Sequence, residues 1–124
     1  MKEWIGAVAL VGMLVSGNAM AVDGNDLLGW CKSALRTTDG TDKGNPTFGT
    51  GYCIATVTSV MDIVYGLGDE LPLKYRACPP SGGIPYGQGM RIVVKYLEDN
   101  PKNLNHEGTV LTMAALRAAY PCTK

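Results

Sequence analysis

The stretch Gly87–Asn100, GQGMRIVVKYLEDN, carries the clearest periodicity in this chain of 124 residues. Its apolar side chains recur at spacings of three and four: Met90, Val93, Val94 and Leu97. Charged side chains fill the opposite positions: Arg91, Lys95, Glu98 and Asp99. This pattern is typical of an amphipathic helix with one face in a core. We expect the helix to end at Asn100, because Pro101 disfavours helical geometry for the residue before it.

The segment that follows predicts a helix with a face of small residues. It is expected to begin near His106, with Asn105 as its N-cap, and to end before Pro121. The face consists of Leu111, Ala115 and Ala118, flanked by Val110 and Ala114. The connection from the preceding helix is short, which predicts antiparallel neighbours. A homodimer is also expected, because one intramolecular neighbour does not use all of the small surface of Ala114, Ala115, Ala118 and Ala119.

Two more helices are predicted upstream. A helix from about Gly51 to Tyr65, with Gly66 just after its end, is indicated by the apolar stripe Ile54, Val57, Met61 and Val64. β-Branched residues keep a strand open for part of this run, although the spacing fits a helix better. A shorter helix is expected over Asp26–Arg36, with Asn25 as its N-cap. Together these segments predict an all-α fold, a small four-helix domain.

Residues 1–21, MKEWIGAVALVGMLVSGNAMA, are typical of a secretory signal peptide. Lys2 gives a positive start, Trp4–Val15 is an uncharged apolar run, and Ala19–Ala21 fits the small-x-small cleavage pattern. A membrane anchor is the alternative, but it needs about 20 consecutive apolar residues. We expect cleavage after Ala21, export from the cytoplasm, and a mature domain of residues 22–124 with no membrane attachment.

Four cysteines, an even number, lie after this segment: Cys31, Cys53, Cys78 and Cys122. In an oxidising compartment such a set predicts two disulfides. No close pair such as C-x-x-C occurs and the chain has one histidine, so no metal site is expected. Three pairings are open, and adjacent ends of antiparallel helix pairs favour Cys31–Cys53 and Cys78–Cys122. Loss of the second bridge is expected to destabilise the fold more, because that bridge closes the larger loop.

Composition and motifs argue against several classes of function. Eleven basic and eleven acidic side chains balance, which disfavours a binder of nucleic acid or of an anionic membrane surface. His106 is the one histidine, and no G-x-S-x-G or comparable nucleophile motif accompanies it. The glycine-rich runs lack the lysine that a phosphate loop needs. We therefore expect no catalytic residues, no cofactor and no enzymatic activity.

The stretch from Leu67 to Tyr86 is the expected surface for contact with a partner. A short turn is expected in it around Asp69–Leu73. Cys78 is expected to pin it to the core, and four prolines restrict its backbone: Pro72, Pro79, Pro80 and Pro85. A restricted loop loses little conformational entropy on binding. Its charged and aromatic side chains are the candidate partner-binding residues: Asp69, Glu70, Lys74, Arg76 and Tyr86. The turn Asn100–Glu107 is the second choice.

Several motifs resemble the Tai family of immunity proteins (type VI amidase immunity). The C-terminal half contains Gly87-Gln88, a V-V-x-Y-L helix end before Pro101, a nearby His106, and the ending Ala115–Cys122, ALRAAYPC. Upstream, Leu27-Leu28-x-x-Cys31 and Gly51-Tyr52-Cys53 are also similar to that family. The chain departs from the family in its loop before Phe48 and in the insert Leu67–Arg76, which leaves the identity of the cognate partner open.

The resemblance implies a small, all-helical, disulfide-bonded periplasmic protein that is often a homodimer. Members of such families bind a secreted effector, commonly a peptidoglycan amidase, and block its active site. The partner implied is therefore a cognate secreted toxin. A competing hypothesis is a periplasmic chaperone of the acid-stress type, which exposes apolar surface when its carboxylates are protonated. A structural component of the cell envelope is a third.

Overall fold

The computed structural model describes residues 21–41 and 45–123, and this part of the chain is helical. Its four α-helices are α2 (Gly24–Thr38), α3 (Phe48–Leu67), α4 (Tyr86–Asp99) and α5 (Gly108–Ala119). Three short 3₁₀ helices join them: η1 (Gly68–Glu70), η2 (Leu73–Tyr75) and η3 (Pro101–Asn103). No strand occurs in these residues, so the predicted all-α, four-helix fold is confirmed. The expected signal peptide lies outside the described residues, except for Ala21.

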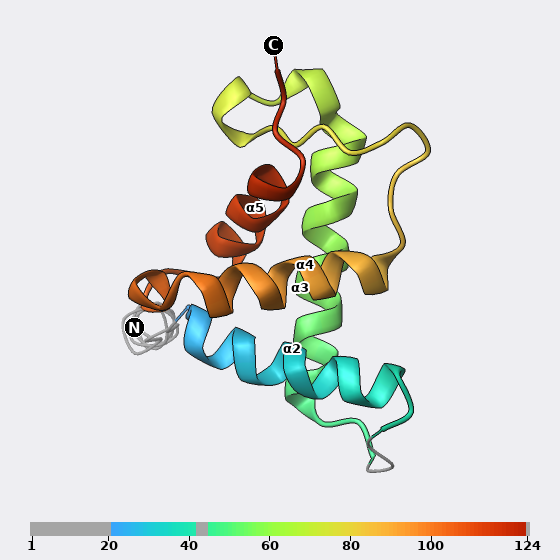
Figure 1. Ribbon diagram of the computed structural model, residues 1–124, viewed down its shortest axis with the longest axis vertical. Coiled ribbons are helices and arrows are strands. Elements are labelled where there is room, and N and C mark those ends of the chain that lie inside the picture. The colour runs from blue at the N-terminus through green and yellow to red at the C-terminus, as the bar shows by residue number, and fades with distance from the viewer. Residues whose placement is uncertain (1–20, 42–44, 124) are drawn as a thin grey trace, which may run out of the picture.

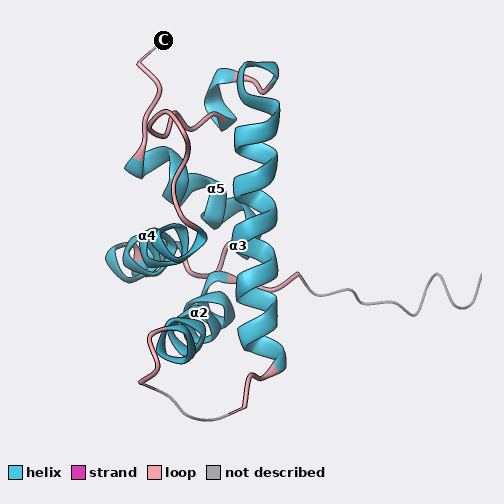
Figure 2. Ribbon diagram, turned by 90° about the vertical axis from the view of Figure 1, so that its right-hand side faces the viewer, coloured by secondary structure: helices cyan, strands magenta, loops and turns pink. Residues whose placement is uncertain are grey.

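The longest helix, α3, runs the length of the molecule, and α2 and α4 lie side by side across it (Figures 1 and 2). These two run in opposite directions, while α5 crosses α4 obliquely and also packs on α3. The prediction that consecutive helices form the antiparallel pairs is therefore wrong. The helix antiparallel to α4 is α2, because the long segment between α3 and α4 lets the chain return across α3 instead of alongside it.

Two of the predicted N-caps are wrong. Asp23, not Asn25, caps α2, and its carboxylate accepts a hydrogen bond from the backbone nitrogen of Asp26 at 3.1 Å. Asn25 is inside the helix, and its side-chain amide donates to the carbonyl of Leu104 at 3.2 Å. The N-cap of α5 is Glu107 rather than Asn105.

The central helix α3 is longer at both ends than its apolar stripe indicates. Thr47 caps it through a reciprocal pair of hydrogen bonds with Thr50, so the helix begins at Phe48. It ends at Leu67, and its C-cap is Gly68, whose positive φ of 49° suits glycine, rather than Gly66. By length and composition this helix with η1 could cross a membrane, yet here it is the central helix of a folded domain.

The core is formed by one face of each helix, with Leu27, Met61, Val93, Leu97 and Leu116 fully buried. Most positions of the predicted faces are confirmed, but Ile54, Ala118 and the flanking Val110 are exposed. Ile54 is 39% exposed, because Cys53 takes the inward position in that turn of α3. Ala118 is exposed, and Thr112 lies in the core instead, where its hydroxyl donates to the carbonyl of Gly108 at 2.8 Å.

Both disulfides pair as predicted. The bond Cys31–Cys53 joins the middle of α2 to α3, and both residues are fully buried in the core. The bond Cys78–Cys122 joins the segment before α4 to the chain after α5, and lies near the surface. The two bonds therefore crosslink different parts of the molecule. Cys31–Cys53 lies inside the core, and Cys78–Cys122 lies outside it.

Candidate binding site

The segment between α3 and α4, residues 68–85, forms one end of the molecule beside the C-terminus (Figure 1). It contains two 3₁₀ turns, η1 and η2, where one turn around Asp69–Leu73 was expected. The rest has no regular structure, as its prolines predict. We call this stretch the 68–85 segment.

Arg76 holds the first half of the 68–85 segment in shape. Its Nε donates to the carbonyl of Leu71 at 2.5 Å, and one Nη donates to the carbonyl of Asp69. The other Nη lies 3.5 Å from the carboxylate of Asp69. Arg76, predicted to bind a partner, therefore uses its guanidinium mainly on the local backbone, whereas the carboxylate of Asp69, also predicted to bind, stays exposed to solvent.

The second half of the segment is held by the chain after α5. The disulfide Cys78–Cys122 joins the two, and the backbone nitrogen of Cys78 donates to the carbonyl of Tyr120 at 2.8 Å. Farther along, the chain turns at Gly82 and Gly83, whose φ angles of 90° and 77° favour glycine. The segment is thus anchored at its middle to the C-terminal end of α5.

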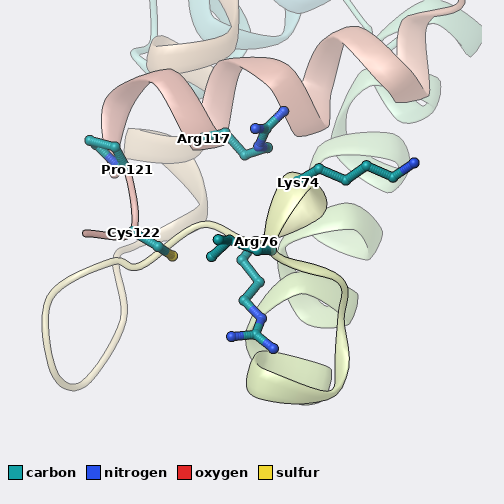
Figure 3. Close-up of a pocket in the computed structure, with 6 residues that line it drawn as sticks. Lys74, Arg76, Arg117, Pro121 and Cys122 are labelled. Carbon is teal, nitrogen blue, oxygen red and sulfur yellow. The ribbon is translucent and has the colours of Figure 1, made fainter. Parts of the chain in front are cut away.

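A groove of about 450 Å³ lies between η2 and α5. It is lined by Leu73, Lys74, Arg76, Arg117, Pro121 and Cys122 (Figure 3). Figure 3 shows the side chains of Lys74 and Arg117 reaching to the same side, with Arg76 turned away from them toward η1. The ammonium of Lys74 lies 4.7 Å from the ring centre of Tyr75, and neither Lys74 nor Arg117 forms an ion pair with a described residue.

The other predicted binding residues lie apart from this groove. Glu70 is exposed in η1 and does not line it. Tyr86 is the first residue of α4, and its hydroxyl donates to the carboxylate of Asp62 at 2.8 Å. That hydrogen bond, with the negative charge of Asp62, raises the pKa of Tyr86 above 10.0. Tyr86 therefore joins α4 to α3 instead of extending the groove.

Arg117 is the groove residue that the sequence did not indicate. It lies in the last turn of α5, within the A-L-R-A-A-Y-P-C ending, and sequence spacing does not relate it to Lys74. Lys74 and Arg117 line the same groove because the Cys78–Cys122 bond and the crossing of α5 bring the 68–85 segment to the C-terminal end of α5. A basic residue in the last turn of a helix was the only available signal.

The second-choice turn, Asn100–Glu107, holds the start of α2. The carbonyl of His106 accepts from the backbone nitrogen of Gly24 at 3.0 Å, and the carbonyl of Leu104 accepts from that of Asn25 at 3.2 Å. The side chain of His106 is exposed. This turn therefore holds the N-terminal end of α2 in place.

The described residues contain no group of three or more His, Cys, Asp or Glu side chains placed to hold a metal ion. What the groove offers is two cations beside an apolar wall, on a backbone anchored at several points. Such an arrangement can bind a partner through charge and shape.

A further exposed feature lies at the other end of α3. The rings of Trp30, Phe48 and Tyr52 pack against one another with centres 5.1–5.9 Å apart, and Phe48 is 77% exposed. Farther from this cluster, Ile63 in the C-terminal half of α3 and Val110 of α5 are also more than half exposed. These exposed apolar side chains on and beside α3 form a second surface available for contact with another protein.

Comparison with protein families gives a match to the model described as Rap1a immunity proteins, over residues 23–122. The matched region contains all four helices, both disulfides and the 68–85 segment. No curated protein and no solved structure matches the chain at significant similarity.

Proposed function

This chain belongs to the Rap1a immunity protein family, and from that premise we propose that it binds a type VI secreted effector and blocks its action. The observation that carries the proposal is the family match over residues 23–122, which spans every described helix. The resemblance to the Tai family in Gly87–Pro101 and Ala115–Cys122 extends the proposal to the toxin class, a peptidoglycan amidase.

The proposed site of action is the periplasm, reached through a signal peptide that is cleaved after Ala21. An amidase that attacks peptidoglycan must be met where peptidoglycan lies. Two disulfides in a domain of this size are also typical of an oxidising compartment, and both are compatible with the fold. Export and protection are thus parts of the same proposal.

The proposed mechanism is occlusion of the toxin's active-site cleft without covalent change. A segment that enters a cleft binds best when it is already ordered, because little conformational entropy is then lost. The 68–85 segment has this property, since Arg76 closes its first half and Cys78–Cys122 fixes its middle. We propose that it is the part of the protein that contacts the toxin.

The test is co-expression in the periplasm with the toxin encoded beside this chain. Cells that carry both genes are expected to grow, while cells that carry the toxin alone are expected to lyse. A variant without residues 2–21 serves as the matched control, and should give no protection because it stays in the cytoplasm. Continued lysis despite abundant, oxidised, exported protein would reject the proposed function.

The acid-stress chaperone remains the second candidate, because one observation favours it. Phe48, Ile63 and Val110 expose apolar surface on and beside α3. A chaperone of that type would gain apolar surface on acidification, and an immunity protein would not.

A further inference from the structure

We propose that the groove between η2 and α5 receives an acidic segment of the toxin, an inference that rests on the proposed function. Lys74 of η2 and Arg117 of α5 would supply the positive charges, and the carboxylates of the partner's segment the negative ones. Charge, the lining of the groove and the rigidity of its walls all favour such an occupant.

Charge is the first argument. Lys74 and Arg117 come from segments far apart in the sequence, and both line the groove. Arg76 beside them is turned toward η1 and lies 3.5 Å from the exposed carboxylate of Asp69. The other described salt bridges involve Lys32, Arg91 and Lys95 elsewhere on the surface. Two like charges that share one groove without a counter-ion repel each other, and a bound carboxylate would remove that cost.

The lining of the groove is the second argument. Leu73, Pro121 and Cys122 form an apolar wall beside the two cations, and Leu73 is 55% exposed. A small inorganic anion would leave this wall uncovered, whereas a peptide segment with an apolar side chain next to its carboxylate would cover it. Nucleic acid is a poor fit, because the chain has no basic excess with which to follow a phosphate backbone.

Rigidity is the third argument. The η2 side of the groove is fixed by the hydrogen bonds and ion pair of Arg76, and the α5 side by the Cys78–Cys122 bond. The backbone segments that carry Lys74 and Arg117 are therefore held in place before the partner arrives. A preformed pair of charges mainly accelerates the encounter of two proteins and makes it depend on salt.

The experiment measures the association rate of the purified mature protein with the toxin encoded beside it, at low salt and at about 0.5 M salt. The test variant carries Lys74→Glu and Arg117→Glu. The matched control is Lys102→Glu, in η3 at the far end of α4, where the lysine is also exposed and also without a described ion pair. Thermal unfolding of each variant checks that the fold is kept.

We expect the double variant to associate about tenfold or more slowly at low salt, with the difference shrinking at high salt. Lys102→Glu should bind like the wild type. Acidic residues of the toxin changed to lysine should then restore binding to the double variant and weaken binding to the wild type. Such a charge swap would identify the bound segment directly.

Two results separate the inference from the proposed function. Equal rates for the wild type and the folded double variant, at both salt concentrations, would overturn the acidic-segment inference and leave the immunity function intact. A wild-type protein that does not bind the toxin at all would overturn the immunity proposal and, with it, the inference.

Discussion

Gly49, in the first turn of α3, lies directly under the indole of Trp30. A β-carbon at this position would stand 2.2 Å from Cδ1 of Trp30, whereas one at Gly51 would meet nothing within 4 Å. Gly49→Ala is therefore expected to destabilise the fold by about 1–3 kcal/mol, because the ring must move. Gly51→Ala is expected to stabilise it by up to about 1 kcal/mol through helix propensity. Urea unfolding measures both, and equal stabilisation would show that the indole shifts freely.

Tyr65 on α3 has a hydroxyl that is covered and has no hydrogen-bond partner among the described residues. Burial, and next the charge of Tyr120, raise the pKa of Tyr65 above 10.0. The folded state thus holds this proton more tightly than the unfolded chain, so the associated stability is complete below pH 10 and is lost as the pH rises through the folded-state pKa.

Tyr65→Phe is expected to raise the free energy of unfolding by about 1 kcal/mol at pH 8, since an unpaired polar group leaves the interior. It should also reduce the loss of stability above pH 10. Urea unfolding at pH 8 and above pH 10 tests this, with Tyr75→Phe at an exposed tyrosine as the control. A stability that falls in Tyr65→Phe would mean that the hydroxyl is satisfied by ordered water.

At the scale of the elements, the two disulfides differ in burial. Cys31–Cys53 lies in the core between α2 and α3, and Cys78–Cys122 ties the 68–85 segment to the end of α5 near the surface. Their sequence separations are 22 and 44, and this doubling favours the outer bond by only about 0.6 kcal/mol of loop entropy. A buried serine hydroxyl without a partner costs about 1–3 kcal/mol.

Burial therefore outweighs loop length, and the order expected from the sequence is reversed. Cys31→Ser should destabilise the fold by more than Cys122→Ser, and denaturant unfolding measures the difference. Under mild reduction followed by alkylation, peptide mass spectrometry should find Cys78 and Cys122 modified before Cys31 and Cys53. A larger loss in Cys122→Ser would restore the loop-length argument.

A homodimer through α4 and α5 is the second prediction at this scale. Ala118 and Ala119 are exposed and line a groove of about 490 Å³ together with Ile92 and Tyr96 of α4. We expect light scattering to give twice the mass of one chain. Ala118→Arg should give the mass of a single chain with little change in thermal stability, because this position is exposed. A wild-type protein with the mass of one chain would remove the prediction.

At the scale of the whole molecule, the buried polar side chains of the described residues are Thr50 and Thr112, and no carboxylate is among them. Acidification therefore does not protonate a group on which the core depends. We expect the fluorescence of an apolar dye, and the thermal transition, to change little between pH 7 and about pH 4. A strong rise in dye binding over this range would instead support the chaperone hypothesis.

The four helices and the end of α4 at Asn100 were predictable, because apolar periodicity and proline geometry act over a few neighbouring residues. The two disulfides were also predictable from the cysteine count, and the mostly irregular backbone of the segment before α4 from its prolines. Four of the five predicted binding residues lie in η1 and η2 or directly after η2: Asp69, Glu70, Lys74 and Arg76.

Only the tertiary structure decided how those pieces meet. Asp23 and Asn25 are equally good caps by sequence, and Asp23 is chosen because the carbonyls of Leu104 and His106 hold the next two residues. Likewise, Lys74 and Arg117 share a groove because α5 crosses toward the Cys78–Cys122 bond. Local patterns determine which residues form helices, but contacts between residues distant in sequence depend on how whole helices pack, and one chain's periodicity does not record that.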